Sequence, residues 1–162
     1  MHFGKREILE LLKERGVEHE VIEHEAVFTM QEMEQLHMDG TPDVAKNLFA
    51  RDPEKHNYYL IVHREDKYVS LKEFGPSICG KPLRLASEDD LDKFLGLKPG
   101  SVSTFGLLND ESRTVKLLMD EDFRGGRIGL HPNENTVTIF MAVDDLIKII
   151  EEHGNPIEFV KF

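Results

Sequence analysis

The stretch VAKNLFARDPEKHNYYLIV, residues 44–62, decides the fold class of this chain. Two runs rich in apolar and aromatic residues, 44–50 and 58–62, flank the polar, proline-containing turn Asp52-Pro53-Glu54-Lys55. Runs of this kind on either side of such a turn are typical of a β-hairpin. The sequence therefore predicts an antiparallel pair of strands at this point of the chain.

The lysine within the first run is unusual for a half-buried strand. Side chains alternate between the two faces of a strand, so Lys46 faces inward if Leu48 does. A buried ammonium group is costly unless it has an anionic partner or reaches a cleft. The alternative is a lysine whose stem lies along the strand edge and whose ammonium group stays in water.

Outward from the hairpin, capping residues and hydrophobic periodicity predict the other elements. Ser87 and Gly96 are typical of the residues that bound a helix, and Gly16 and Gly154 are expected helix ends. Helices are expected at 5–15, from Thr29-Met30-Gln31-Glu32 to about 39–40, at 88–95, and from an Asp144 cap through Ile150. Strands are expected at 19–24, 103–108, 115–119, 127–130, 136–142 and 157–160.

This mixture of helices with strands joined by short links predicts an α/β domain of mixed, α+β-like type with a largely antiparallel sheet. The 162 residues suit one domain, 1–162, and contain no repeat or linker that divides them. The first residues lack the apolar core of a signal peptide, and no apolar run approaches the ~20 residues of a membrane helix. A cytoplasmic protein that does not act at a membrane is expected.

The charge balance limits the partners. The net charge of −11 argues against broad, non-specific binding to DNA or RNA, which uses large basic faces. It leaves room for a small basic patch that holds one RNA end. Lys72, Lys81, Arg84, Arg124 and Arg127 are candidates for such a patch, or are ordinary solvated charges.

Common catalytic and metal motifs do not occur. The eight histidines include no His-Glu-x-x-His helix, and no cysteine and histidine pair stands at ligand spacing, so no metal site is expected. The sequence holds no nucleophile elbow, phosphate loop or dinucleotide fingerprint, and no cofactor is expected. The single cysteine, Cys79, is expected to be a packed residue. The alternative is a thiol hydrolase with Cys79 as its nucleophile.

Two further segments are unusual for purely structural sequence. Thr104-Phe105-Gly106-Leu107-Leu108-Asn109-Asp110 has a glycine within an apolar run, which indicates either a bulge or a close approach to the backbone. Ile128-Gly129-Leu130-His131-Pro132-Asn133-Glu134-Asn135-Thr136 is either a plain turn between strands or a loop whose main-chain groups face a cleft. In the second case His131 stands at the lip of that cleft.

Together with Ala45-Lys46-Asn47-Leu48-Phe49 and Leu97-Lys98-Pro99-Gly100-Ser101-Val102, these segments resemble the YbaK/ProX family of aminoacyl-tRNA deacylases. That family is related to the editing domain of bacterial prolyl-tRNA synthetases, and the resemblance covers nearly the whole chain. It is greatest to the freestanding branch that acts on alanyl-tRNA(Pro). The resemblance implies a mixed, mostly antiparallel sheet wrapped by helices, with the substrate in a cleft.

The resemblance also implies roles for particular residues. Lys46 corresponds to the family lysine that meets the tRNA 3′ end, and Gly129 to Pro132 to the loop that binds the ester. His131 replaces the serine of the cysteine-clearing branch, and Ile128 stands where many relatives have a glycine. Lys46, Gly129 and His131 are thus the expected catalytic residues. Substrate contacts are expected from Asn47, Gly106, Leu107, Leu108, Asn109, Leu130, Pro132 and Asn135.

The expected function is trans-editing: hydrolysis of a mischarged aminoacyl-tRNA, first of all Ala-tRNA(Pro), at its 3′ adenosine. An aminoacyl ester is already activated, so a water held at attack distance and donors for the oxyanion suffice. The expected partners are the 3′ end and acceptor stem of tRNA(Pro), and prolyl-tRNA synthetase. The alternatives are a deacylase for cysteinyl- or seryl-tRNA, and a non-catalytic module of the same fold that binds tRNA or a synthetase.

Overall fold

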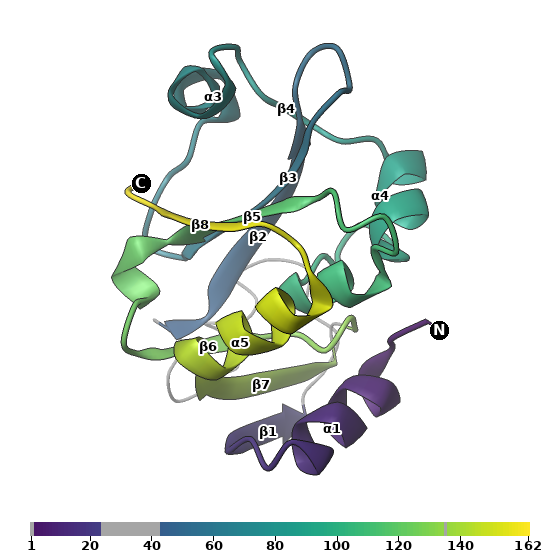
Figure 1. The fold of residues 1–162 in the computed structure, drawn as a ribbon. Helices are drawn as coiled ribbons and strands as arrows, with labels where there is room; N and C mark the ends of the chain where they lie inside the picture. The colour runs from purple at the N-terminus through teal and green to yellow at the C-terminus, as the bar shows by residue number, and fades with distance from the viewer. Residues whose placement is uncertain (1, 24–42, 135) are drawn as a thin grey trace.

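The fold is built on two sheets, and a computed structural model describes it for residues 2–23, 43–134 and 136–162 (Figure 1). The larger sheet has five strands in the order β4-β2-β3-β5-β8 and the smaller has three in the order β1-β7-β6. The bounds in the larger sheet are β2 Ala45–Arg51, β3 Tyr58–Arg64, β4 Arg84–Leu85, β5 Lys116–Asp120 and β8 Ile157–Val160. Those in the smaller are β1 His19–Glu23, β6 Arg127–Leu130 and β7 Val137–Ala142.

The predicted hairpin forms the centre of the larger sheet. β2 and β3 pair antiparallel from Ala45 opposite Arg64 to Arg51 opposite Tyr58. β3 then pairs parallel with β5, and β5 with β8, so this sheet is mixed. The smaller sheet is antiparallel throughout. An isolated bridge between Val44 and Gly129 joins the start of β2 to β6, so the two sheets meet at this point.

The helices cover the sheets where their apolar faces can be buried. The helices are α1 Lys5–Glu14, α3 Leu71–Cys79, α4 Glu88–Leu95 and α5 Val143–His153, with short 3₁₀ turns η2 Thr104–Asn109 and η3 Glu121–Phe123. Ser87 caps α4 by accepting the Asp90 amide at 3.1 Å, and Gly96 and Gly154 end α4 and α5 in the left-handed conformation, as predicted. None of the described helices is long and apolar enough to cross a membrane.

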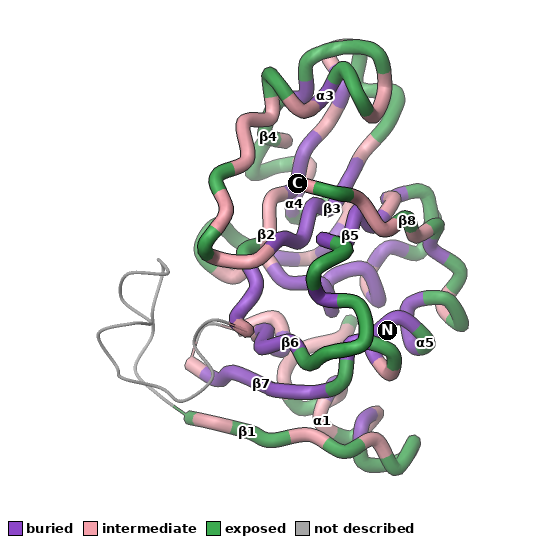
Figure 2. Tube along the Cα trace, turned by 90° about the vertical axis from the view of Figure 1, so that its left-hand side faces the viewer, coloured by how far each residue is buried: buried purple, intermediate pink, exposed green. Residues whose placement is uncertain are grey.

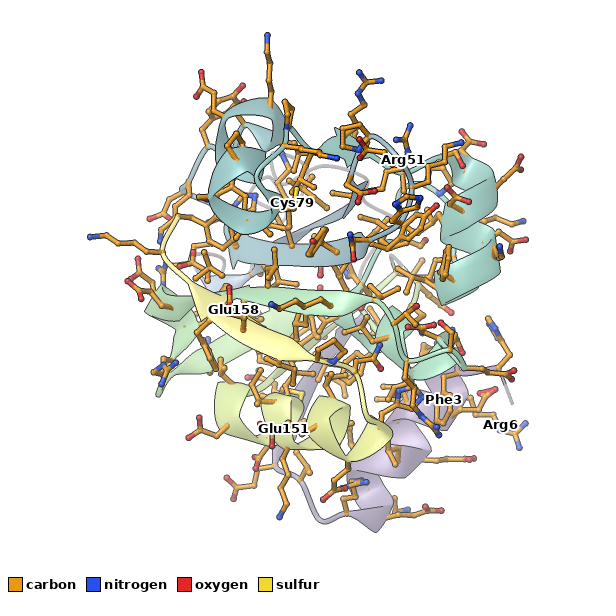
Figure 3. The ribbon with its side chains drawn as sticks, turned by 45° about the horizontal axis from the view of Figure 1, so that its top comes forward. Phe3, Arg6, Arg51, Cys79, Glu151 and Glu158 are labelled. Carbon is orange, nitrogen blue, oxygen red and sulfur yellow. The ribbon has the colours of Figure 1, made fainter. Side chains whose placement is uncertain are left out.

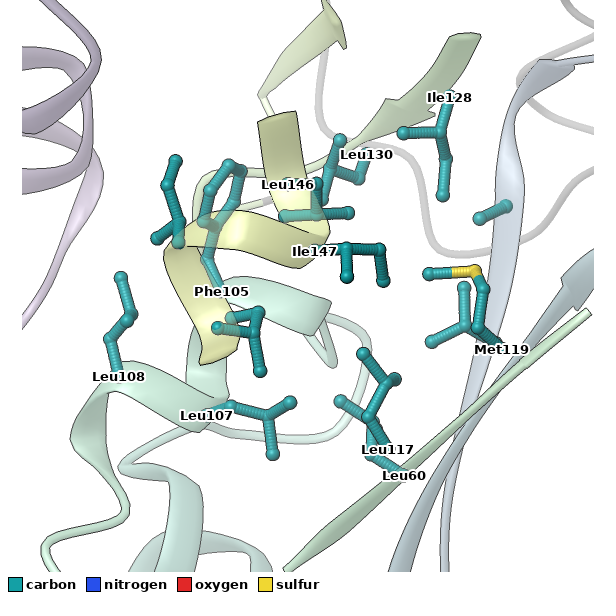
Figure 4. Packing of buried hydrophobic residues seen from close by; sticks show 14 of the residues in the cluster. Leu60, Phe105, Leu107, Leu108, Leu117, Met119, Ile128, Leu130, Leu146 and Ile147 are labelled. Carbon is teal, nitrogen blue, oxygen red and sulfur yellow. The ribbon is translucent and has the colours of Figure 1, made fainter. Parts of the chain in front are cut away.

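The main core lies between the two sheets. Phe105 and Leu107 of η2 pack there with Leu146 of α5 and with Leu60 and Leu117 of the larger sheet (Figure 4). A smaller cluster lies on the other face of the larger sheet beneath α3, and includes Ala50, Tyr59, Ile61 and Leu118. Figure 2 shows the result: β3, β5 and β7 are buried, whereas β1 lies at the surface.

Several predictions of local structure are wrong. Residues 103–108 do not form a strand, because Ser103 accepts the Phe105 amide and begins the 3₁₀ turn η2. Asp144 does not cap α5, whose N-cap is Ala142. The sequence pattern did not predict α3 or β4. The predicted helix from Thr29 to about residue 40 lies outside the described residues.

Candidate functional site

Lys46 is the second residue of β2 and lies on the face of the sheet that α3 covers. Ala45 and Phe49 point into the main core, whereas Leu48 and Ala50 belong to the cluster beneath α3. The alternation of side chains therefore puts Lys46 on the α3 side, on the same face of β2 as Leu48. Its side chain is exposed, so its ammonium group keeps contact with water.

A buried histidine stands beside Lys46 on the neighbouring strand. His63 is the cross-strand partner of Lys46 and is only 1% exposed. Its Nδ1 lies 2.7 Å from the Arg64 carbonyl and its ring lies 6.0 Å from the Phe162 ring. Burial lowers the pKa of His63, and the charge of Lys46 acts in the same direction. The neutral form is favoured, so His63 adds no second positive charge next to Lys46.

Asn47, the next residue, reaches the opposite face of β2. Its Oδ1 accepts a hydrogen bond of 3.0 Å from the Thr104 hydroxyl, which is fully buried. The adjacent Ser103, also fully buried, donates its hydroxyl to the carbonyl of His131. Asn47, Thr104, Ser103 and His131 thus form a continuous connection between β2 and the loop that follows β6.

This loop is held from several sides. The bridge from Val44 to Gly129 fixes its start, and Pro132 in its middle is buried. The ring Nδ1 of His131 lies 2.8 Å from the Val137 carbonyl; a carbonyl only accepts, so Nδ1 carries the proton. Asn133 has a φ of +62° and donates its side-chain amide to the Phe3 carbonyl at 2.7 Å. The main chain from 129 to 133 is therefore rigidly placed.

The packing of Phe140 explains why residue 129 is a glycine. A Cβ added at this position would lie 2.6 Å from Cε1 of Phe140, its partner across β6 and β7. Phe140 is buried, and the Arg127 guanidinium stacks on its ring at 4.6 Å. The glycine lets this ring lie directly against the main chain at the start of the loop.

The structure places the second predicted segment in the core. Gly106, Leu107 and Leu108 are buried in η2, and an added Cβ on Gly106 would lie 2.7 Å from Leu97. Leu130 is likewise a core residue. The close approach to Gly106 is thus made by the Leu97 side chain, and the three leucines predicted as substrate contacts are buried.

The Asn109 side chain hydrogen-bonds to the N-terminal segment. Its Oδ1 accepts the Phe3 amide at 2.6 Å, and its Nδ2 donates to the Leu95 carbonyl at 2.9 Å. It also lines a hollow of about 430 Å³ together with His2 and Gly96, and Asn47 is not among the residues that line this hollow. Of the predicted residues, the structure thus brings together Asn47, Gly129, His131 and Pro132, with Lys46 on the other face of the same strand. Asn135 lies outside the described residues.

Ser103 and Thr104 connect β2 to the loop after β6, and the sequence pattern did not predict this role. The available signal was two consecutive hydroxyl residues directly before the apolar run 105–108. Hydroxyls that are buried must find partners, and here the partners are a β2 side chain and a loop carbonyl.

The remaining candidate groups are engaged elsewhere. Cys79 ends α3, half-buried, and its thiol donates to the Lys81 carbonyl at 3.2 Å (Figure 3). No group of three or more histidine, cysteine or acidic side chains that could hold a metal ion is found in the part of the chain that the structure describes.

Three of the five basic candidates have partners. Lys81 pairs with Glu54 at 2.7 Å and Arg127 with Asp43 at 3.0 Å. Arg124 stacks on Phe159 at 4.1 Å. Lys72 and Arg84 are exposed. These two exposed side chains are therefore the better candidates of the five for contact with a polyanion.

Comparisons with known proteins show which family the chain is similar to. The model of the aminoacyl-tRNA editing domain matches residues 24–149. The chain is 35% identical, over 98% of its length and 97% of the relative, to the prolyl-tRNA editing protein ProX of Acetoanaerobium sticklandii. It is 33% identical to the prolyl-tRNA synthetase associated domain-containing protein 1 of Danio rerio, over 91% of this chain and 82% of that one. A crystal structure of a candidate trans-editing enzyme for prolyl-tRNA synthetase has the same fold, with a TM-score of 0.71 at 19% identity over 98% of this chain and 96% of that one.

Proposed function

Because this chain belongs to the aminoacyl-tRNA editing domain family, we propose that it hydrolyses mischarged aminoacyl-tRNA in trans. The ProX relative that it resembles over its whole length is named for editing of prolyl-tRNA. The substrate of this chain is accordingly tRNA(Pro) carrying the wrong amino acid, and the enzyme is an ester hydrolase. The acceptor stem of that tRNA, and prolyl-tRNA synthetase as the source of the error, are its proposed partners.

The observation that carries the proposal is the rigid loop at the joint of the two sheets. Ser103 and the bridge from Val44 fix the main chain around Gly129 and His131 beside Asn47 of β2. An activated ester needs a held water and fixed dipoles more than it needs a strong nucleophile. The main-chain groups of this loop, held in place beside Asn47, supply such dipoles and need not reorganise during the reaction.

In the proposed reaction a water oxygen bonds to the acyl carbon, and the bond from that carbon to the ribose oxygen breaks. The ribose oxygen takes up a proton, so the products are the free amino acid and a tRNA with an intact terminal adenosine. Main-chain groups of the loop after Gly129 orient the water, and His131 shapes the pocket for the amino acid. The exposed ammonium group of Lys46 neutralises a phosphate near the tRNA 3′ end.

Alanine is the proposed amino acid. A synthetase pocket built for proline cannot strongly exclude a smaller side chain, because a missing methylene is worth only ~1–3 kcal/mol. A second and smaller site, which admits alanine and rejects proline, removes the resulting error. Selectivity for alanine over cysteine or serine then depends on the size of the site that receives the amino acid, which we propose that His131 shapes.

A deacylation panel tests the proposal. Purified protein is incubated with tRNA(Pro) charged with alanine, cysteine, serine or proline, and the loss of each ester is followed. We expect the alanyl ester to be hydrolysed fastest and Lys46→Ala to lower kcat/KM at least about tenfold with an unchanged melting temperature. The matched control is Lys148→Ala, another exposed lysine, on α5. Binding of tRNA without hydrolysis above buffer would instead identify a non-catalytic module.

A further inference from the structure

Tyr68, in the loop between β3 and α3, is the most exposed large apolar residue in the part of the chain that the structure describes. It is 92% exposed, against 61% for Leu85 and 41% for Val21. Single exposed apolar residues are common on protein surfaces, so this exposure alone indicates no function. The surroundings of Tyr68 in the fold do point to one.

The loop that carries Tyr68 is held on both sides of this residue. Before it, the Lys67 ammonium group bonds at 2.8 Å to the carboxylate of Asp120, which is fully buried. After it, the Ser70 hydroxyl caps α3 by accepting the Glu73 amide at 3.3 Å. The backbone around Tyr68 is therefore fixed, and its ring is presented to solvent from a fixed position.

This loop lies at the end of the hairpin that carries Lys46. Lys46 pairs with His63 across β2 and β3, and directly after β3 the Lys67 amide donates to the Arg64 carbonyl at 3.2 Å. The chain then leads to α3, which covers the face of the larger sheet on which Lys46 lies (Figure 1). Tyr68 thus stands between the end of β3 and the start of that helix.

Aromatic packing brings the first turn of α3 close to the partner of Lys46. The ring of Phe74 lies 4.6 Å from the ring of Phe162, which in turn lies 6.0 Å from the ring of His63. The Phe74 amide donates to the Ser70 carbonyl at 2.8 Å, so this turn follows directly on the loop of Tyr68. The loop and Lys46 therefore belong to one region of the surface.

The charges in this region favour stacking over purely electrostatic binding. Two exposed cations are present, Lys46 on β2 and Lys72 in the first turn of α3. The loop itself contains Glu65 and Asp66, and the whole chain has a net charge of −11. An RNA strand therefore gains little from charge alone at this place, whereas a nucleobase that stacks on an aromatic ring is held without a positive charge.

We propose that Tyr68 is a substrate-binding residue whose ring stacks on an unpaired nucleobase of the tRNA 3′ end, beside the phosphate that Lys46 neutralises. The proposal rests on the hydrolysis of aminoacyl-tRNA proposed above. The 3′ end of a tRNA is single-stranded beyond the acceptor stem, so its bases can present a free face to an aromatic side chain. A base held at Tyr68 restricts the strand that carries the ester before the reaction begins.

Tyrosine fluorescence tests this contact without any reaction. The chain has no tryptophan and three tyrosines, of which Tyr58 is half-buried and Tyr59 is buried. The protein is titrated with an uncharged RNA hairpin that carries the acceptor stem and 3′ end of tRNA(Pro). A base stacked on Tyr68 quenches its emission, so we expect saturable quenching that Tyr68→Ala lacks. The same hairpin without its unpaired 3′ nucleotides should not cause it.

The kinetics of alanyl-tRNA(Pro) hydrolysis measure what the contact contributes. Loss of a stacked aromatic ring weakens binding by a factor of about 5–100, and an exposed site belongs at the lower end. We therefore expect Tyr68→Ala to raise KM about fivefold with kcat within about twofold of wild type, and Tyr68→Phe, which keeps the ring, to restore KM. The ratio of the two KM values should not change with salt concentration, because ions do not screen stacking.

The matched control is Val21→Ala, which truncates another exposed apolar residue on the smaller sheet. It should leave KM and kcat unchanged. Because Tyr68 and Val21 are both exposed, neither alanine variant should change the melting temperature appreciably. A change in KM of Tyr68→Ala alone therefore reports the contact with RNA and not a loss of folded protein.

The outcomes separate this inference from the proposed function. If wild-type protein hydrolyses the ester while Tyr68→Ala keeps its KM within twofold and its quenching, Tyr68 does not bind the RNA, and the hydrolase assignment still stands. An equal rise of KM in Tyr68→Phe and Tyr68→Ala, or full quenching by the hairpin without unpaired nucleotides, would also overturn the stacking. No hydrolysis by wild-type protein would refute the proposed function, and the quenching would still test the contact.

Discussion

Replacement of Gly129 by alanine asks whether this glycine serves packing or substrate access. The added Cβ would lie 2.6 Å from Cε1, 3.0 Å from Cδ1 and 3.1 Å from Cζ of the Phe140 ring. The ring is buried and the Arg127 guanidinium stacks on it, so it cannot easily move away. Overpacking of this kind costs ~1–3 kcal/mol of the free energy of unfolding.

The cost can be measured and assigned. For a protein of this size we expect Gly129→Ala to lower the melting temperature by roughly 3 °C for each kcal/mol. Phe140→Leu removes the ring atoms that the new methyl group would meet, but it also removes a buried ring and so has a cost of its own. Gly129→Ala should therefore lower the melting temperature much less when it is added to Phe140→Leu than when it is added to wild type. The control is Gly126→Ala, because the nearest atom to its added Cβ is the Phe123 carbonyl oxygen at 3.5 Å, an ordinary contact.

The deacylation rate of the same variants decides the role of Gly129. If packing is the only reason for the glycine, the double variant matches Phe140→Leu in both stability and activity. If the ester also approaches the main chain at Gly129, the double variant matches Phe140→Leu in stability but has a lower activity. A melting temperature of Gly129→Ala equal to that of wild type would refute the packing argument itself.

Two further predictions concern the groups that hold the fold around the site. Ser103→Ala removes the buried hydroxyl that donates to the His131 carbonyl. We therefore expect the free energy of unfolding, measured in urea, to fall by ~1–3 kcal/mol, and kcat to fall as well. An unchanged kcat would show that the loop does not depend on this bond. Burial alone would raise the pKa of Asp120, but the 2.8 Å bond from Lys67 and two backbone amides outweigh it and hold that pKa below its usual value. Ionised Asp120 thus contributes stability above about pH 4 that is lost as the pH falls through its lowered pKa, and Asp120→Asn should make the unfolding free energy less steep in that acid range, whereas an equally steep decline would contradict this assignment.

The parts of the fold that sequence predicts well are those with local causes. The hairpin of β2 and β3, the cap at Ser87 and the helix end at Gly154 all depend on residues within a few positions of one another. The bounds of β6 match for the same reason, since its apolar run is followed directly by a proline turn.

α3 shows why other parts were missed. This helix contains Gly75 and Pro76, which disfavour a helix when the segment is considered alone. In the fold, a Cβ added on Gly75 would lie 2.4 Å from both the Leu83 amide nitrogen and the Lys81 carbonyl oxygen. The glycine is needed because the chain after α3, at Lys81 to Leu83, crosses the helix at this point. This crossing is a tertiary contact, so the local sequence pattern does not predict it.

The candidate site was only partly predictable for a related reason. The sequence pattern of an apolar run such as Leu107 and Leu108 is the same whether the run lines a pocket or fills the core. Here the run fills the core. The contacts that define the site join residues distant in sequence, Thr104 to Asn47 across 57 positions and Ser103 to His131 across 28. Residue types could suggest the strand and the loop separately, but only the fold shows what connects them.

This connection has a consequence for how stability and activity depend on one another. The bridge from Val44 to Gly129 joins the two sheets, and Ser103 and Thr104 bond to His131 and Asn47 beside it. These three contacts together form the joint between the sheets. A change that loosens the joint can therefore displace Asn47 from the loop while each sheet keeps its own strand pairs. Because the cross-strand ladders are separate from these contacts, activity should be lost under milder denaturing conditions than secondary structure, and simultaneous loss of both would mean that the joint has no independent motion.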